Sequence, residues 1–191
     1  MSSFLAALPI IFAHEGGWVN DPADLGGETN YGISMRFIKA AHLQPFELGL
    51  KDFSPGCLKL LTREKAAWLY ENYFWAPAGR ASPATLMNQD SANKLFDAIV
   101  NLGRVQAVLC AQRAVGGVMQ DGILGPETLT HIDLMEDDFE EAMAEAMKQR
   151  YLHILDADPS QDKFRHNWLG RAACTSKHRC PCHPATVAPE A

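Results

Sequence analysis

The stretch AHEGGWVNDPADLGGETNYGIS, from Ala13 to Ser34, separates an apolar N-terminal segment from a chain otherwise dominated by helical periodicity. It places Glu15 where the apolar segment ends and follows it with glycines, further carboxylates and turn residues. Glycine, asparagine, aspartate and proline at this density interrupt a helix and favour a loop or small hairpin. We therefore predict a carboxylate-rich loop within a helical chain.

Helical patterns occupy most of the remaining sequence, and the alternation typical of strands is almost absent. Apolar residues recur every three or four positions along four segments, 62–75, 91–103, 105–117 and 137–157. Thr62 is placed to cap the first of these helices, and Pro126 is placed to begin a further one. The predicted fold class is all-α, with at most a short β-hairpin near residues 18–32.

The same periodicity predicts which side chains face the core. In the segment 137–157 the buried stripe comprises Phe139, Met143, Met147, Tyr151, Ile154 and Leu155. In the segment 91–103 it comprises Ala92, Leu95, Phe96 and Ile99. In the segment 62–75 it comprises Ala66, Leu69, Tyr73 and Phe74.

Length and charge limit the function classes. A chain of 191 residues with 47% hydrophobic content can bury one sizeable core, or one core with a small appended module. A formal net charge of −6 argues against a nucleic-acid partner, because binding phosphates needs an excess of Lys and Arg on one face. The apolar N-terminus lacks a basic leader and is too short to span a bilayer, so we predict neither a signal peptide nor stable membrane insertion.

The cysteines fall into two groups. Cys57 and Cys110 stand alone within apolar helical patterns and are expected to be buried thiols. The tail, residues 173–191, is rich in cysteine and histidine but has no zinc-site spacing, and we expect it to be disordered. The run NDPADLGGE offers oxygen ligands without following the calcium-loop pattern, so no metal site is predicted.

The carboxylate-rich loop has the composition that glycoside cleavage requires. That reaction needs one carboxylic acid to protonate the leaving oxygen and a second carboxylate to act on water or the developing positive charge. Glu15, at the end of an apolar helix, is in an environment that favours the protonated acid, whereas Asp21 and Asp24 lie in a polar loop that favours ionisation. The alternative is that the aspartates only cap turns, which is an ordinary role for this residue type.

These residues also carry a resemblance to a known family. The stretch HEGGWVNDPADLGGETNYGIS resembles the opening of the phage-type N-acetylmuramidases of glycoside hydrolase family 108. FDAIVNLG resembles the central helix of that family, and YLHILDADPSQDKFRHNWLGRA resembles its closing segment. The resemblance covers most of residues 4–172 and implies a lysozyme-like fold.

The resemblance also implies catalytic roles. Glu15, Asp24 and Thr29 follow the order of the Glu, Asp and Thr triad of the wider group of phage lysozymes. In that triad Glu is the acid, and Asp with Thr positions the attacking water. The interval from Asp24 to Thr29 is one residue shorter here, and Asp21 is the alternative second carboxylate.

A second resemblance lies further along the chain. The stretch AVLCAQRAVGGVMQDGILGPETLTHI resembles a helical peptidoglycan-binding module, with a match at Asp121, Gly122, Gly125, Pro126 and Thr128. We interpret these residues as fixing the turn between two helices. The predicted organisation is a catalytic region over 1–100, a peptidoglycan-binding-like region over 101–172 and a disordered tail over 173–191.

Aromatic faces and short polar side chains are typical of saccharide grooves. Trp18 and Tyr31 flank the carboxylate-rich loop and are the candidates for sugar binding. Asn30 and Asn101 are candidates for hydrogen bonds to N-acetyl groups, with backbone capping as the alternative. Trp168 is expected to pack the last helix.

The resemblance implies a muramidase that cleaves the β-1,4 bond between N-acetylmuramic acid and N-acetylglucosamine of peptidoglycan, without metal or organic cofactor. The alternatives are a lytic transglycosylase and a non-catalytic wall-binding or secretion-accessory protein. The glycan strands of peptidoglycan are the expected partner, and we expect a monomer. We predict synthesis in the cytoplasm and action on the cell wall, after release by a phage holin or a secretion system.

Overall fold

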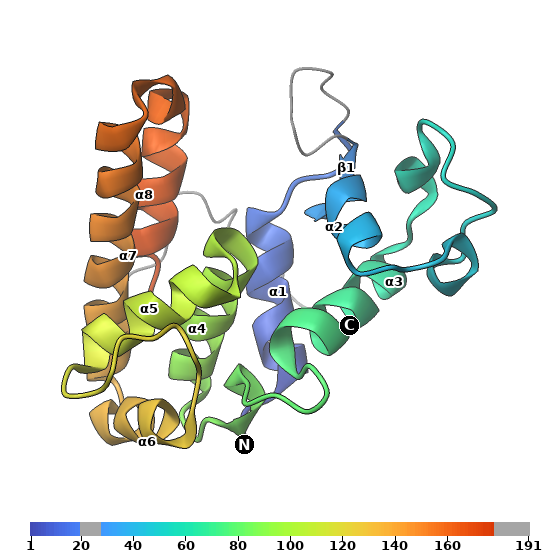
Figure 1. Ribbon diagram of the computed structural model, residues 1–191. Helices are drawn as coiled ribbons and strands as arrows, with labels where there is room; N and C mark the ends of the chain where they lie inside the picture. The colour runs from blue at the N-terminus through green and yellow to red at the C-terminus, as the bar shows by residue number, and fades with distance from the viewer. Residues whose placement is uncertain (20–27, 178–191) are drawn as a thin grey trace. The chain divides into compact units, whose positions relative to one another are not determined.

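The computed structural model describes residues 1–19 and 28–177, and within them the chain is mainly helical, as predicted. The α-helices are α1 (Phe4–His14), α2 (Met35–Ala40), α3 (Arg63–Tyr70), α4 (Gln89–Leu102), α5 (Arg104–Val115), α6 (Pro126–Met135), α7 (Asp138–Ala157) and α8 (Arg165–Ala173) (Figure 1). The strands are β1 (Thr29–Asn30) and β2 (Ile33–Ser34). Short 3-10 helices are η1 (Pro45–Leu48), η2 (Cys57–Leu60), η4 (Pro83–Thr85) and η5 (Pro159–Phe164), and η3 (Glu71–Trp75) is a π-helix.

The chain divides into two compact units. Unit 1 comprises Met1–His14 and Phe74–Ala191, and unit 2 comprises Glu15–Tyr73. The predicted boundary between the catalytic region, 1–100, and the peptidoglycan-binding-like region, 101–172, stays a prediction. No helix among the described residues is long and apolar enough to cross a membrane.

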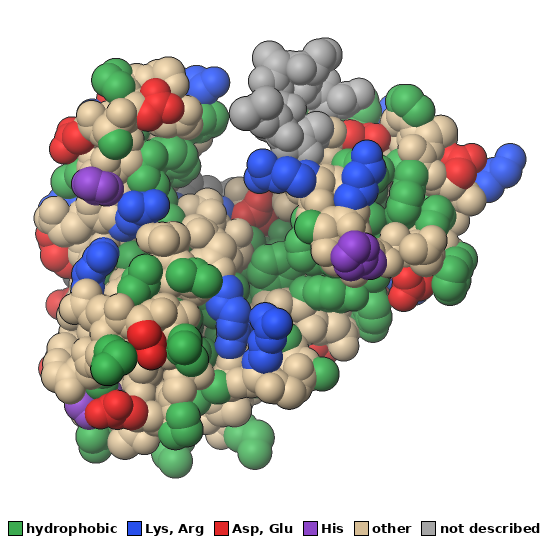
Figure 2. Space-filling model, in the orientation of Figure 1, with side chains coloured by type: hydrophobic (Ala, Val, Ile, Leu, Met, Phe, Trp, Pro, Cys, Tyr) green, Lys and Arg blue, Asp and Glu red, His purple; other side chains and the backbone are tan. Residues whose placement is uncertain are grey.

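The core of unit 1 is built from α1, α4, α5, α7 and α8, and α7 and α8 run side by side (Figure 1). The buried stripe predicted for α4 is confirmed, because its four residues are all at most 2% exposed. The stripe predicted for α7 is confirmed at Phe139, Met143, Met147, Tyr151 and Leu155, whereas Ile154 is partly exposed. On the face of unit 1 that Figure 2 shows, acidic, basic and hydrophobic side chains all lie at the surface.

The prediction of which side chains are buried in the segment 62–75 was partly wrong. Ala66 and Leu69 are buried, and Thr62 caps α3 by accepting a hydrogen bond from the Lys65 N–H. Beyond Tyr70 the helix widens into the π-helix η3, which changes the rotation per residue and so the face that each side chain takes. Tyr73 is therefore 36% exposed, and Trp75 is the residue that is buried.

The turn between α5 and α6 has the predicted construction. The Asp121 carboxylate accepts the Ile123 N–H at 2.8 Å and the side-chain amide of Gln112, also at 2.8 Å. Pro126 is the first residue of α6, a position where its missing N–H costs nothing. Asp121 and Pro126 therefore shape local backbone, as the sequence predicted.

Two further packing predictions are confirmed. Cys57 and Cys110 are free, buried thiols, and burial raises the pKa of each. Trp168 packs the end of unit 1, where its ring stacks on Tyr151 and on Phe164, each with ring centroids 5.4 Å apart.

A cluster of charged side chains is buried in unit 1 around Asp97, which is only 3% exposed. Its Oδ1 lies 3.0 Å from His14 Nδ1 and 2.9 Å from Arg171 Nη2. Burial alone raises the pKa of Asp97, but the Arg171 guanidinium and the hydrogen bond from His14 hold that pKa well below its ordinary value. Lys94 donates to the Ala172 carbonyl at 2.7 Å, and burial lowers the pKa of Lys94 to about 8. The cluster joins α1, α4 and α8 through charge-assisted hydrogen bonds.

Candidate active site

The predicted hairpin forms at the end of the carboxylate-rich loop. Thr29 pairs with Ser34 and Asn30 pairs with Ile33, which leaves Tyr31 and Gly32 as a two-residue turn. Both turn residues have positive φ, 49° and 75°, as a type I′ turn requires. The hairpin therefore spans 29–34, at the far edge of the predicted range 18–32.

An isolated bridge closes the base of this loop. Val19 and Thr29 exchange backbone hydrogen bonds of 2.8 and 2.9 Å. The bridge brings together the two ends of the segment that contains Asp21 and Asp24. Both aspartates lie outside the described residues, so their predicted roles as the second carboxylate stay predictions.

Glu15 is the first residue after α1 and the first residue of unit 2. Its side chain is partly buried and lies against Gly32, in the turn of the hairpin. A Cβ atom added to Gly32 would lie 2.5 Å from Glu15 Oε2 and 2.7 Å from Glu15 Cγ, and it would also overlap the Tyr70 hydroxyl. Two features of position 32 therefore require glycine: the positive φ of its backbone and the close approach of the Glu15 side chain.

Tyr70 is a residue that sequence reasoning missed. It is 1% exposed at the end of α3, and its hydroxyl donates to the Tyr31 carbonyl at 2.8 Å. This bond fixes the turn that contacts Glu15. The helical periodicity gave no signal for the role, because a buried tyrosine on a helix is usually read as core.

Trp18 is held beside the loop by Glu28, a carboxylate of the same stretch to which the sequence gave no role. Its indole Nε1 donates to Glu28 Oε1 at 2.9 Å, and Glu28 also accepts the Gly56 N–H at 3.0 Å. Glu28 is 8% exposed, whereas the Trp18 side chain is 40% exposed. The Lys59 ammonium lies 5.3 Å from the centre of the indole ring. The arrangement fixes an aromatic ring at the surface of unit 2, which is what saccharide binding uses.

The two asparagines proposed for N-acetyl groups both have internal partners. Asn30 is 5% exposed, and its side-chain amide donates to the Leu58 carbonyl at 2.7 Å. This contact favours the backbone-holding alternative for Asn30. Asn101 lies at the end of α4 in unit 1, where its Oδ1 accepts a hydrogen bond from the Tyr151 hydroxyl. The Nδ2 of Asn101 keeps its capacity to donate.

The described candidate residues of unit 2 carry carboxyl, aromatic and hydroxyl groups. Across residues 1–19 and 28–177, no group of three or more His, Cys, Asp or Glu side chains is arranged to hold a metal ion. The described candidates are one partly buried carboxylate, one exposed aromatic ring and the hydroxyl-bearing hairpin residues Thr29 and Tyr31.

Comparisons with known proteins agree with this chemistry. The family described as glycosyl hydrolase 108 matches residues 8–103, and the one described as "Predicted Peptidoglycan domain" matches residues 106–173. Among solved structures, SagA of Brucella abortus is similar, with 29% sequence identity, a TM-score of 0.68 and a match covering 89% of each chain. No curated protein matches the sequence.

The first match covers the second half of α1, the carboxylate-rich loop, the hairpin and α4. The second covers most of α5 and the chain from there to the end of α8. A glycoside hydrolase region followed by a peptidoglycan domain identifies the substrate polymer and the class of reaction. The chain belongs to the glycosyl hydrolase 108 family and is a peptidoglycan hydrolase.

Proposed function

We propose that the chain is an N-acetylmuramidase that uses Glu15 as its general acid. The observation that carries this proposal is the placement of the Glu15 carboxyl, which lies partly buried against Gly32 beside the Tyr70 hydroxyl. A general acid needs a fixed position, because proton transfer requires it within hydrogen-bond reach of the leaving oxygen. The hairpin and α3 supply that fixation.

In the proposed reaction, the Glu15 proton passes to the glycosidic oxygen as the bond from that oxygen to C1 of N-acetylmuramic acid breaks. Water attacks C1 and gives its proton to a second carboxylate, Asp24 or Asp21, with Thr29 helping to orient the water. The products are a new reducing N-acetylmuramic acid and a free 4-hydroxyl on N-acetylglucosamine. Trp18 and Tyr31 would line the sugar-binding surface next to this loop.

Product analysis tests the assigned bond. Purified peptidoglycan is digested by the full chain in heavy-oxygen water, and the fragments are analysed by mass spectrometry after borohydride reduction. The proposal expects labelled muramitol ends. Reduced glucosamine ends would assign the other glycosidic bond, and anhydro-muramic ends without label would assign a lytic transglycosylase; either result overturns the proposal. The export route and monomeric state stay predictions.

Replacement of Gly32 by alanine is expected to reduce hydrolysis by roughly tenfold or more, since displacement of a catalytic group by about 1 Å can cost that much. The physical reason is the overlap of the new Cβ with the Glu15 carboxyl. Release of reducing ends from purified peptidoglycan measures the effect.

Gly49→Ala is the matched control for this variant. Gly49 also lies in unit 2 and has a φ of 71°, but a Cβ there meets nothing within 4 Å. The Gly49→Ala variant therefore carries the backbone strain, about 1 kcal/mol, without any overlap of the new Cβ with a neighbouring side chain. Equal activities of Gly32→Ala and Gly49→Ala would show that the Glu15 contact is irrelevant to catalysis.

A further inference from the structure

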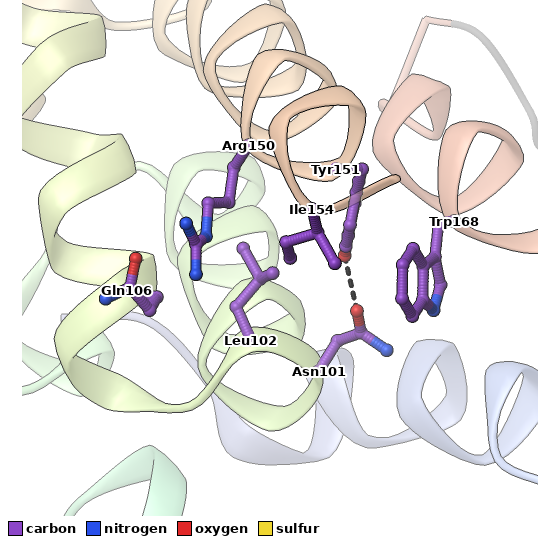
Figure 3. A pocket seen from close by; sticks show the side chains of 7 residues that line it. All are labelled: Asn101, Leu102, Gln106, Arg150, Tyr151, Ile154 and Trp168. Atoms are coloured by element: carbon purple, nitrogen blue, oxygen red, sulfur yellow. Dashed lines mark hydrogen bonds between the residues drawn. The ribbon is translucent and has the colours of Figure 1, made fainter. Parts of the chain in front are cut away.

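A small pocket opens in unit 1 among α4, α5, α7 and α8 (Figure 3). Its volume is about 140 Å³, which corresponds to about five water molecules. Leu102 and Ile154 supply apolar wall, and Asn101, Gln106 and Arg150 supply polar atoms. The pocket therefore suits a small polar group on a short carbon chain and is too small to enclose a disaccharide.

Arg150 gives the pocket its charge. Its Nε is buried without a hydrogen-bond partner, and no carboxylate within the described ranges forms an ion pair with its guanidinium. Some other cations of unit 1 have a carboxylate partner, as Lys148 has in Glu145 and Arg165 has in Asp162. A partly buried guanidinium without a counter-charge loses hydration that a bound anion would compensate.

The neighbouring side chains add donors to this cation. The Tyr151 hydroxyl donates to Asn101 Oδ1, which leaves Asn101 Nδ2 turned toward Trp168, as Figure 3 shows. Trp168 lines the pocket, and its ring already stacks on both Tyr151 and Phe164. Stacking of a sugar on Trp168 is therefore disfavoured, whereas the hydrogen-bond donors match an oxyanion.

We propose that this pocket binds a carboxylate of peptidoglycan, with Arg150 as its counter-charge and the amide of Asn101 as an additional donor. Five of the seven lining residues fall within 106–173, the region that matches the peptidoglycan domain. Peptidoglycan offers this chemistry in two places, the stem-peptide carboxylates and the lactyl carboxylate of a muramic acid without a peptide. The inference rests on the chain acting on peptidoglycan but not on Glu15 as the acid.

The test measures binding of four small probes to the full chain by NMR titration, followed at the side-chain signals of Trp168 and Asn101. The probes are N-acetylglucosamine, N-acetylmuramic acid, N-acetylmuramoyl-alanyl-isoglutamate and the same muramoyl dipeptide with its carboxylates amidated. None contains the bond that the enzyme cleaves. Failure of this proposal is therefore distinguishable from failure of the proposed muramidase activity.

We expect at least one carboxylate probe to shift both signals, and N-acetylglucosamine and the amidated dipeptide to shift neither. Saturation by N-acetylmuramic acid assigns the lactyl carboxylate, and saturation by the muramoyl dipeptide alone assigns the stem peptide. Both outcomes support a carboxylate site. Equal binding of the amidated and free dipeptides, or no response to either carboxylate probe, overturns the proposal.

Arg150→Met keeps an unbranched apolar stem and removes the charged guanidinium, and it is expected to weaken binding of the responding probe about tenfold. Arg150→Lys keeps the charge and is expected to bind more tightly than Arg150→Met. Arg113→Met is the matched control, because it removes an exposed arginine from α5, and it should leave the dissociation constant within about twofold. Equal affinities of the Arg150→Met and Arg113→Met variants would contradict the assignment.

Discussion

Glu15→Gln is expected to lower peptidoglycan hydrolysis by about 10²–10⁴-fold, the usual contribution of a positioned general acid. Glutamine keeps the shape that packs against Gly32 and the Tyr70 hydroxyl, but it has no proton to give to the leaving oxygen. The loss should therefore appear in the rate at saturating substrate and not in the stability of the fold. Release of reducing ends from purified peptidoglycan measures the first, and the thermal unfolding midpoint, Tm, measures the second.

Glu64→Gln is the control for this experiment. Glu64 is an exposed glutamate in the first turn of α3, in the same unit, so the change removes the same charge without touching the hairpin. It should retain nearly the parent rate. A Glu15→Gln variant that hydrolyses peptidoglycan as fast as Glu64→Gln would falsify the assignment of the acid. Asp21→Asn and Asp24→Asn, compared in the same assay, decide which aspartate serves as the second carboxylate.

Asp97→Ala is expected to destabilise the protein by roughly 3–5 kcal/mol, the usual cost of removing one partner from a buried ion pair. The change leaves Arg171 and His14 in a buried site without the carboxylate that both contact. For a chain of this size the loss corresponds to a fall in Tm of about 6–20 °C. Calorimetric or fluorescence-detected unfolding at neutral pH measures it.

The exposed pair Asp162 and Arg165 provides the matched comparison. Their N–O distance is 2.7 Å, but their side chains are 63% and 44% exposed. Asp162→Ala should therefore cost less than about 1 kcal/mol, because solvent screens the pair. If both variants lost the same stability, the buried cluster around Asp97 would not be a main contributor to the fold.

The pH dependence of stability gives an independent readout. Because the pKa of Asp97 in the folded protein lies below its ordinary value of 3.8, the unfolded chain binds the proton first as the pH falls. The stabilisation by Asp97 is thus fully present above about pH 5 and is lost progressively below about pH 4. In Asp97→Asn this loss should be absent, so the difference in unfolding free energy between the wild type and the variant should shrink on acidification.

The helical elements were largely predictable because their determinants are local. The periodicity of α4 and α7 identified the side chains that are buried, and Thr62 and Pro126 identified two helix starts. The prediction was wrong where the chain left the regular α-helical repeat at η3, which exchanged Tyr73 for Trp75 in the core. A π-helical turn depends on the packing around it, and the sequence pattern contains no signal for it.

The sequence by itself determined the helical class, the position of Glu15 at a helix end and the family resemblance of the loop, since these depend on residue types at fixed spacing. Only the tertiary structure placed Tyr70 and Gly32 against Glu15, Glu28 in hydrogen-bond contact with Trp18, and Arg150 in a pocket where no described carboxylate forms an ion pair with it. Each of these contacts joins residues from different segments of the chain. Their proximity is decided by how helices and hairpin pack, and periodicity along one segment carries no information about which segment lies opposite it.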